Sequence, residues 1–280
     1  MKKLSIITTA AILAVSPVFA STVNILWYTG GTKVTSTAGS YETVINALAV
    51  QEANPIFNIS GSINTWNITY WTGGAKPVGT FNVLVAAAAA GPWNTNPNYL
   101  ALTTGVNAAS FGDRVMLTGQ DADWHLAYTP GPGLFNNPAG FLIDAVNWAG
   151  SGTGMGGVFL NTGVEGSIFS GFGTSQIANN IITIPPAYAA FPINAGLTSA
   201  GLSGWNDSAH DTFNITDSSK WTAINTTAAG PAITIVSAAT AGGGTSSVPD
   251  TGSTLAMLLL SVVSFGVIRH FVRGEGAALS

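Results

Sequence analysis

The sequence predicts an α/β domain in which a mostly parallel β-sheet is covered by helices on both faces. Several short runs of consecutive apolar residues are typical of strands that are buried on both sides. At least one longer segment between such runs has apolar residues at helical spacing. An all-β sandwich is the alternative fold, because the chain is rich in Gly, Thr and Asn, as exported sandwich domains often are.

The predicted strands and helices alternate along the chain. A first strand at 22–28 ends before a pair of glycines, and residues 41–50 then carry apolar side chains at helical spacing. A helix is expected at 137–148, with Pro138 in its first turn. The Gly-rich segment 150–157 follows it and is interpreted as a connection to the next strand, since it lacks the Lys of a phosphate-binding loop. Further buried strands are expected at 81–85, 114–118 and 157–160.

Two stretches do not follow this alternation. Residues 56–71 alternate Asn and Thr with aromatic side chains, as an extended strand or hairpin does. Residues 212–236 end in a β-branched run and are expected to hold further β structure.

Residues 1–20 are expected to be a secretory signal peptide that signal peptidase removes. Lys2 and Lys3 precede an apolar run that ends in the small residue Ala20. One globular domain is expected at 21–240. The chain has no cysteine, so an exported product would be held together by its packed core rather than by disulfides.

The charge of the body argues against binding to nucleic acid. Residues 21–247 contain four basic and ten acidic side chains. Phosphates require clustered Lys and Arg, which this composition does not supply.

The C-terminal region has the order of a sorting signal. A linker at 241–247 precedes a polar motif, an apolar run at 255–268 and two arginines. As a helix the run would span about 21 Å, which is less than the roughly 30 Å hydrocarbon core. We therefore expect it to tether the protein to the membrane only before the tail is processed. The polar motif consists of Val248, Pro249, Asp250, Thr251, Gly252, Ser253 and Thr254.

This tail, 248–273, resembles the PEP-CTERM class of sorting tails in its VPDSG-like variant, with Thr251 in place of the more usual Ser. The resemblance implies that an exosortase, an integral-membrane enzyme of Gram-negative bacteria, recognises and cuts the tail. It also implies delivery of the body to the cell envelope, the cell surface or the extracellular matrix. The polar motif would then be the substrate of another enzyme.

The candidate binding residues Asp121, Asp123 and His125 follow a predicted strand. In open α/β sheets ligands bind at the carboxyl ends of strands. If the segment is extended, these alternate positions face the same way and converge on one divalent cation or polar ligand. Calcium would use the carboxylate oxygens and a transition metal would also use His125. The structural alternative is that the aspartates cap the following turn.

A weaker candidate group is Asp207, His210 and Asp211. On a helix Asp207 and Asp211 would share a face, although the segment also suits a surface loop. His210 and His125 could meet in space, which the sequence alone does not decide. Aromatic side chains such as Trp27 and Trp66 make a glycan a candidate ligand, and the alternative is that they fill the core.

Three segments of the body resemble the class I glutamine amidotransferase-like family. They are residues 24–28 of the first predicted strand, the stretch 115–125, and the helix from Phe141 to Trp148. The resemblance implies a flavodoxin-like sheet. Active amidotransferases of that family use a cysteine nucleophile, which this chain lacks, so the resemblance supports the fold and counts against that reaction.

From these features we expect an exported protein that an exosortase sorts and whose body is non-catalytic or ligand-binding. The alternative is a secreted hydrolase-like enzyme, with or without a metal ion, that acts on a carbohydrate or a related polar substrate.

Overall fold

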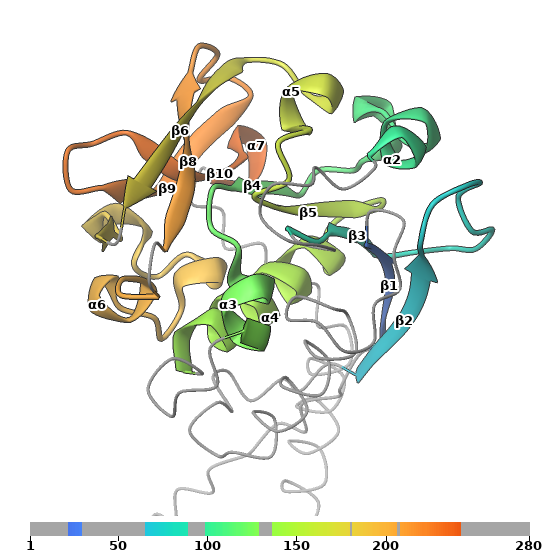
Figure 1. The fold of residues 1–280 in the computed structure, drawn as a ribbon, viewed down its shortest axis with the longest axis horizontal. Helices are drawn as coiled ribbons and strands as arrows, with labels where there is room; N and C mark the ends of the chain where they lie inside the picture. Colours follow the sequence, from blue (N-terminus) through green and yellow to red (C-terminus); the bar gives the residue numbers. More distant parts are fainter. Residues whose placement is uncertain are drawn as a thin grey trace, which may run out of the picture. The chain divides into compact units, whose positions relative to one another are not determined.

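The fold is built on a ten-stranded mixed sheet whose first five strands run parallel to one another (Figure 1). The strands are β1 (Thr22–Tyr28), β2 (Thr65–Trp71), β3 (Val83–Ala86), β4 (Val115–Thr118) and β5 (Gly156–Leu160). Most residues of β1, β3, β4 and β5 are apolar and buried, as a sheet covered on both faces requires, whereas β2 at the edge is only partly buried. The predictions at 22–28, 81–85, 114–118 and 157–160 are thereby confirmed, as is the extended structure at the end of 56–71.

The second half of the sheet is antiparallel and is joined to the first half by one strand. That strand is β10 (Ala232–Ser237), which pairs with β4 of the first half. It also pairs antiparallel with two strands of the second half, β8 (Ala209–Ile215) and β9 (Trp221–Thr227). The remaining strands, β6 (Phe172–Asn179) and β7 (Ile182–Thr183), pair with β8 and β9. The β structure expected at 212–236 is therefore present as three strands.

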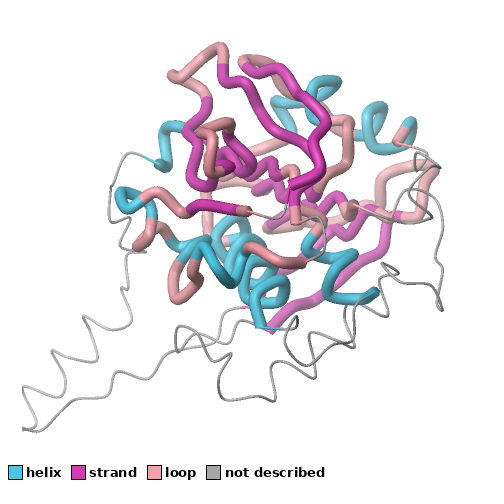
Figure 2. Tube along the Cα trace, turned by 60° about the vertical axis from the view of Figure 1, so that its left-hand side comes forward, coloured by secondary structure: helices cyan, strands magenta, loops and turns pink. Residues whose placement is uncertain are grey.

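Helices lie on both sides of the sheet (Figure 2). The longest, α4 (Asn136–Gly150), confirms the helix predicted at 137–148, and the Gly-rich segment after it leads into β5 as expected. Because helices cover the sheet, the described residues form an α/β fold and not a pair of packed β-sheets. The other helices are α2 (Leu100–Gly105), α3 (Ala122–Tyr128), α5 (Glu165–Ile168), α6 (Ser199–Leu202) and α7 (Ala238–Ala241); short 3-10 turns lie at Ala108–Ser110, Pro186–Tyr188 and Pro192–Asn194.

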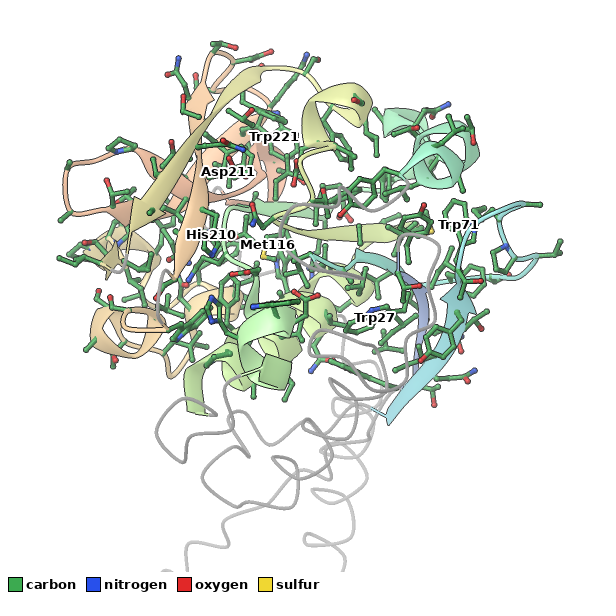
Figure 3. The ribbon with its side chains drawn as sticks, viewed as in Figure 1. Trp27, Trp71, Met116, His210, Asp211 and Trp221 are labelled. Carbon is green, nitrogen blue, oxygen red and sulfur yellow. The ribbon has the colours of Figure 1, made fainter. Side chains whose placement is uncertain are left out.

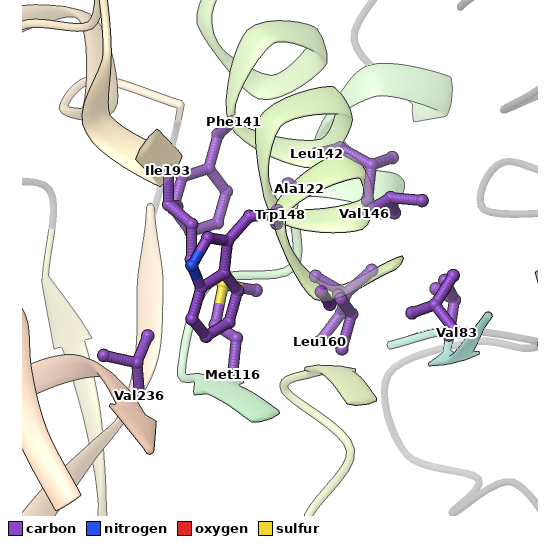
Figure 4. Packing of buried hydrophobic residues seen from close by; sticks show 14 of the residues in the cluster. Val83, Met116, Ala122, Phe141, Leu142, Val146, Trp148, Leu160, Ile193 and Val236 are labelled. Carbon is purple, nitrogen blue, oxygen red and sulfur yellow. The ribbon is translucent and has the colours of Figure 1, made fainter. Parts of the chain in front are cut away.

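Two hydrophobic clusters form the core, one on each face of the sheet. Successive residues of a strand point to opposite faces, so Ile25 and Trp27 enter one cluster while Leu26 and Tyr28 enter the other. Figure 4 shows part of the first cluster, in which α4 packs over the sheet. The labelled side chains there include Phe141, Leu142 and Val146 of α4 and Val83, Met116 and Leu160 of the sheet.

The computed structural model describes residues 22–29, 65–88, 99–128, 136–179, 181–205 and 208–241. All of them lie within one compact unit, Ala20–Gly244. The predicted signal peptide, the helix expected at 41–50 and the sorting tail lie outside the described residues. Among the described helices, none is long and apolar enough to cross a bilayer.

The parallel strands follow the order β2-β1-β3-β5-β4. A flavodoxin-like sheet has the order 2-1-3-4-5, so β4 and β5 are exchanged relative to it. The exchange places β4 next to β10, at the boundary between the parallel and antiparallel halves.

The backbone of β8 lies very close to Gly119, which directly follows β4. The N–H of Gly119 donates to the carbonyl of Ile233 in β10, and its carbonyl accepts from the N–H of His210 in β8. A Cβ at this position would lie 1.9 Å from the carbonyl oxygen of Asp211. The absence of a side chain therefore lets β8 pass the end of β4.

We predict that Gly119→Ala destabilises the protein by roughly 1–3 kcal/mol, because the new methyl group forces the two strands apart. Urea-induced unfolding would measure the change. Gly173→Ala is the matched control, since the added methyl would meet no atom within 4 Å. Equal stability of the two variants would contradict the close approach.

Candidate functional site

The candidate residues that follow β4 lie at the start of a helix. The expectation of an extended segment at 121–125 is wrong, because α3 begins at Ala122. Asp121 immediately precedes the helix, and its carbonyl accepts the first helical hydrogen bond from the N–H of His125. Residues four apart share a helix face, so the helix brings His125 to Asp121 and turns Asp123 elsewhere.

The third member of the site comes from β8, not from a loop or a helix. His210 and Asp211 are neighbours within this strand, so their side chains point to opposite faces (Figure 3). The helical arrangement considered for 207–211 is therefore wrong for His210 and Asp211. Asp207 lies outside the described residues. The N–H of His210 bonds to Gly119, which fixes this histidine beside the end of β4.

The two histidines meet at the carboxylate of Asp121. His125 Nε2 lies 3.0 Å from Asp121 Oδ1, and His210 Nε2 lies 3.4 Å from the same oxygen. The imidazole rings are nearly parallel, with an interplanar angle of 7° and centroids 6.2 Å apart. The exposed fractions of Asp121, His125 and His210 are 3 %, 5 % and 9 %, so the group is almost fully buried.

The group has the composition and spacing of a metal-binding site. Each of the three residues offers one ligand atom, and these atoms all lie within 4.8 Å of one another. One side of the group is closed by Trp205, whose ring centroid lies 5.8 Å from that of His125. Trp205 is itself packed edge-on against Phe141 of α4.

The protonation of Asp121 is set by two opposing effects. Burial raises the pKa of its carboxyl, but the imidazoles of His125 and His210 beside it lower the pKa by more, to below its usual range. Asp121 is therefore a carboxylate at neutral pH. Its negative charge is available to a cation or to protonated imidazoles.

Asp123 has a different role from the one predicted. Its Oδ2 accepts a hydrogen bond of 2.9 Å from the N–H of Ala88, which lies shortly after β3. The side chain therefore connects α3 to the segment that follows β3. Burial, and then the charge of Asp121, raise the pKa of Asp123 to about 7. Within the described residues it does not belong to the group of three ligand atoms.

A second set of polar side chains follows β5 and was not singled out from the sequence. Glu165 is buried and accepts from the N–H and the hydroxyl of Thr162, at 3.1 and 2.9 Å. Burial raises its pKa. Burial and the charge of Glu165 raise the pKa of Asp211 to about 6, while His210 acts in the opposite direction. The available signal was the spacing Thr-x-x-Glu after a strand, which is typical of a helix start.

A separate cleft of about 410 Å³ lies by the amino end of β4. Its lining includes Phe111, Phe169, Lys220 and Trp221. None of the candidate residues named in the sequence lines this cleft. Trp27, which the sequence offered for glycan binding, is fully buried in the core instead.

Comparison with known proteins does not indicate a family for this chain. The chain matches no protein-family model, no curated protein and no solved structure.

Asp144 of α4 is a half-buried residue whose Oδ2 atom is buried, and it is not part of the Asp121–His125–His210 group. Its Oδ2 has no hydrogen-bond partner among the described residues, and burial raises its pKa to about 8. Because folding raises the pKa of this carboxyl, the folded state is less stable when the carboxyl is ionised than when it is protonated. As pH rises from about 4 to about 8, the unfolded chain loses this proton before the folded chain does, and stability falls.

We predict that Asp144→Asn removes this part of the pH dependence. The variant should exceed the wild type in free energy of unfolding by at least about 1 kcal/mol at pH 8.5, since one unit of pKa shift corresponds to about 1.4 kcal/mol. The difference should shrink toward pH 5. Asp113→Asn, at an exposed carboxylate, is the control, and a difference that does not change with pH would refute the assignment.

Proposed function

We propose that this protein is exported, is processed at its C-terminal tail by an exosortase, and is displayed at the cell surface or in the extracellular matrix. There its body binds a polar ligand or an ion at the carboxyl end of β4. The order of linker, motif, apolar run and arginines supports the sorting step. The absence of cysteine from the whole chain supports a role other than amidotransferase catalysis.

The convergence of Asp121, His125 and His210 carries the binding proposal. A carboxylate and two imidazoles are costly to bury, and such groups cluster at functional sites in protein structures. These residues come from two segments of the chain that lie more than 80 positions apart. They meet at the strand end where α/β sheets bind ligands.

The likeness to the class I glutamine amidotransferase-like fold is part of the proposal. Five parallel strands with helices on both faces support it. The exchanged positions of β4 and β5 depart from the flavodoxin-like order.

Export and processing predict a defined mass. Protein recovered from the native envelope and medium should lack residues 1–20 and the residues after about Asp250, as intact-mass spectrometry would measure. The control is a variant in which Pro249 and Asp250 are both replaced by Ala, which should retain 255–273 because the sorting motif is lost. A wild-type mass that retains Leu255 to Arg273 would overturn the processing step.

A secreted hydrolase is the second candidate, because two histidines and one carboxylate are also the protein ligands of catalytic zinc sites. It predicts that the purified protein hydrolyses chromogenic acetyl esters or glycosides, and that Asp121→Asn lowers kcat/KM by at least about 100-fold through loss of a reacting-centre group. Steady-state kinetics on such a panel would measure this. Equal rates for the wild type and Asp121→Asn would exclude catalysis at this site.

A further inference from the structure

The three converging side chains define the chemistry of the ligand that this site would take. They present two imidazole nitrogens and one carboxylate oxygen. Bonds of about 2.0–2.2 Å to a tetrahedral zinc ion place neighbouring ligand atoms about 3.3–3.6 Å apart. Between Asp121 Oδ1 and the Nε2 atoms, the separation of 3.4 Å to His210 lies in that range, and that of 3.0 Å to His125 lies about 0.3 Å below it.

We infer that Asp121, His125 and His210 bind a divalent first-row transition-metal ion of the zinc class. The inference rests on the proposed binding site at the end of β4 and names its ligand.

The donor set excludes the other cations that carboxylates commonly bind. Calcium takes six to eight oxygen ligands and magnesium prefers oxygen ligands in octahedral geometry. Imidazole nitrogen suits zinc, copper, iron and nickel. Two of the three ligand atoms here are imidazole nitrogens, so the choice between calcium and a transition metal that the sequence left open falls to the transition metal.

The direction of the side chains also favours a shared ion. Both Nε2 atoms approach one oxygen, Asp121 Oδ1, within ion-pair distance. These contacts place the carboxylate oxygen between the two imidazoles. Three ligand atoms that lie this close together can all bind a single metal ion.

The site is held in place before any ion binds. The first turn of α3 sets the position of His125 relative to Asp121, and the backbone bond to Gly119 sets that of His210. Asp123 is committed to Ala88, and Asp211 lies on the opposite side of β8. An ion at this point would link the parallel half of the sheet to the antiparallel half.

The test uses the full-length chain, expressed for export and recovered after treatment with a chelator. Zinc or cobalt(II) is then added, and bound metal per chain is measured by inductively coupled plasma mass spectrometry. We expect one equivalent of zinc, a rise in Tm because binding favours the folded state, and visible d–d absorption for the cobalt form. Calcium at the same concentration should give neither binding nor a shift in Tm.

His210→Gln should weaken zinc binding on the order of 100-fold or more, since even residues that only support metal ligands contribute 10–100-fold. Asp211→Asn is the matched control on the same strand and should bind zinc as the wild type does. His125→Gln provides an independent ligand variant if His210→Gln does not fold, as judged by circular dichroism.

Failure of the wild type to bind zinc or cobalt at one per chain would overturn the inference, as would binding by folded His210→Gln at wild-type affinity. Binding of calcium in preference to zinc would overturn it as well. The intact mass reports export and processing independently. If the protein binds no metal but is still processed, only the inference of a metal site is refuted. If it binds zinc but keeps its tail, only the sorting proposal is refuted.

Discussion

The candidate site depends on one close backbone contact. The carbonyl of Asp211 comes so near to Gly119 that no residue with a Cβ fits at that position without movement. This contact allows the N–H of His210 to bond to the carbonyl of Gly119. Because Asp121 follows two residues later, the same contact determines how far the imidazole of His210 lies from the carboxylate. A glycine that appears in the sequence only as the end of a strand therefore helps to set the geometry of the candidate site.

The environment, and not the residue type, distinguishes the two aspartates of this segment. Asp121 and Asp123 are only two positions apart and both are buried. Two imidazoles flank Asp121 and lower its pKa. Burial and the charge of Asp121 raise the pKa of Asp123 to about 7, although the N–H of Ala88 bonds to this carboxyl and acts in the opposite direction. One carboxyl is thus ionised and able to attract a cation, and the other serves to fasten α3 to the region after β3. A sequence pattern of alternating aspartates does not contain this distinction.

The elements that the sequence predicted well are those whose signal is local. Continuous apolar runs indicated the strands, and helical spacing from Phe141 to Trp148 indicated α4. The conformation of 121–125 was predicted wrongly because a short polar segment has no apolar periodicity to distinguish helix from strand. The position of His210 beside Asp121 could not be predicted, since it depends on strand pairing between distant segments. The exchanged order of β4 and β5 has the same origin: pairing partners are chosen by three-dimensional packing of similar apolar strands.

The mixed character of the sheet explains why a histidine from a strand completes the site. In a fully parallel sheet, side chains at the carboxyl edge come from the loops and helix starts that follow each strand. Here β10 runs antiparallel to β4, and it brings β8 past the end of that strand. His210 is therefore held by the backbone hydrogen bonds of a sheet, which position a side chain more rigidly than a loop does. A site built in this way can bring together ligands of fixed geometry even though its two histidines belong to different halves of the fold.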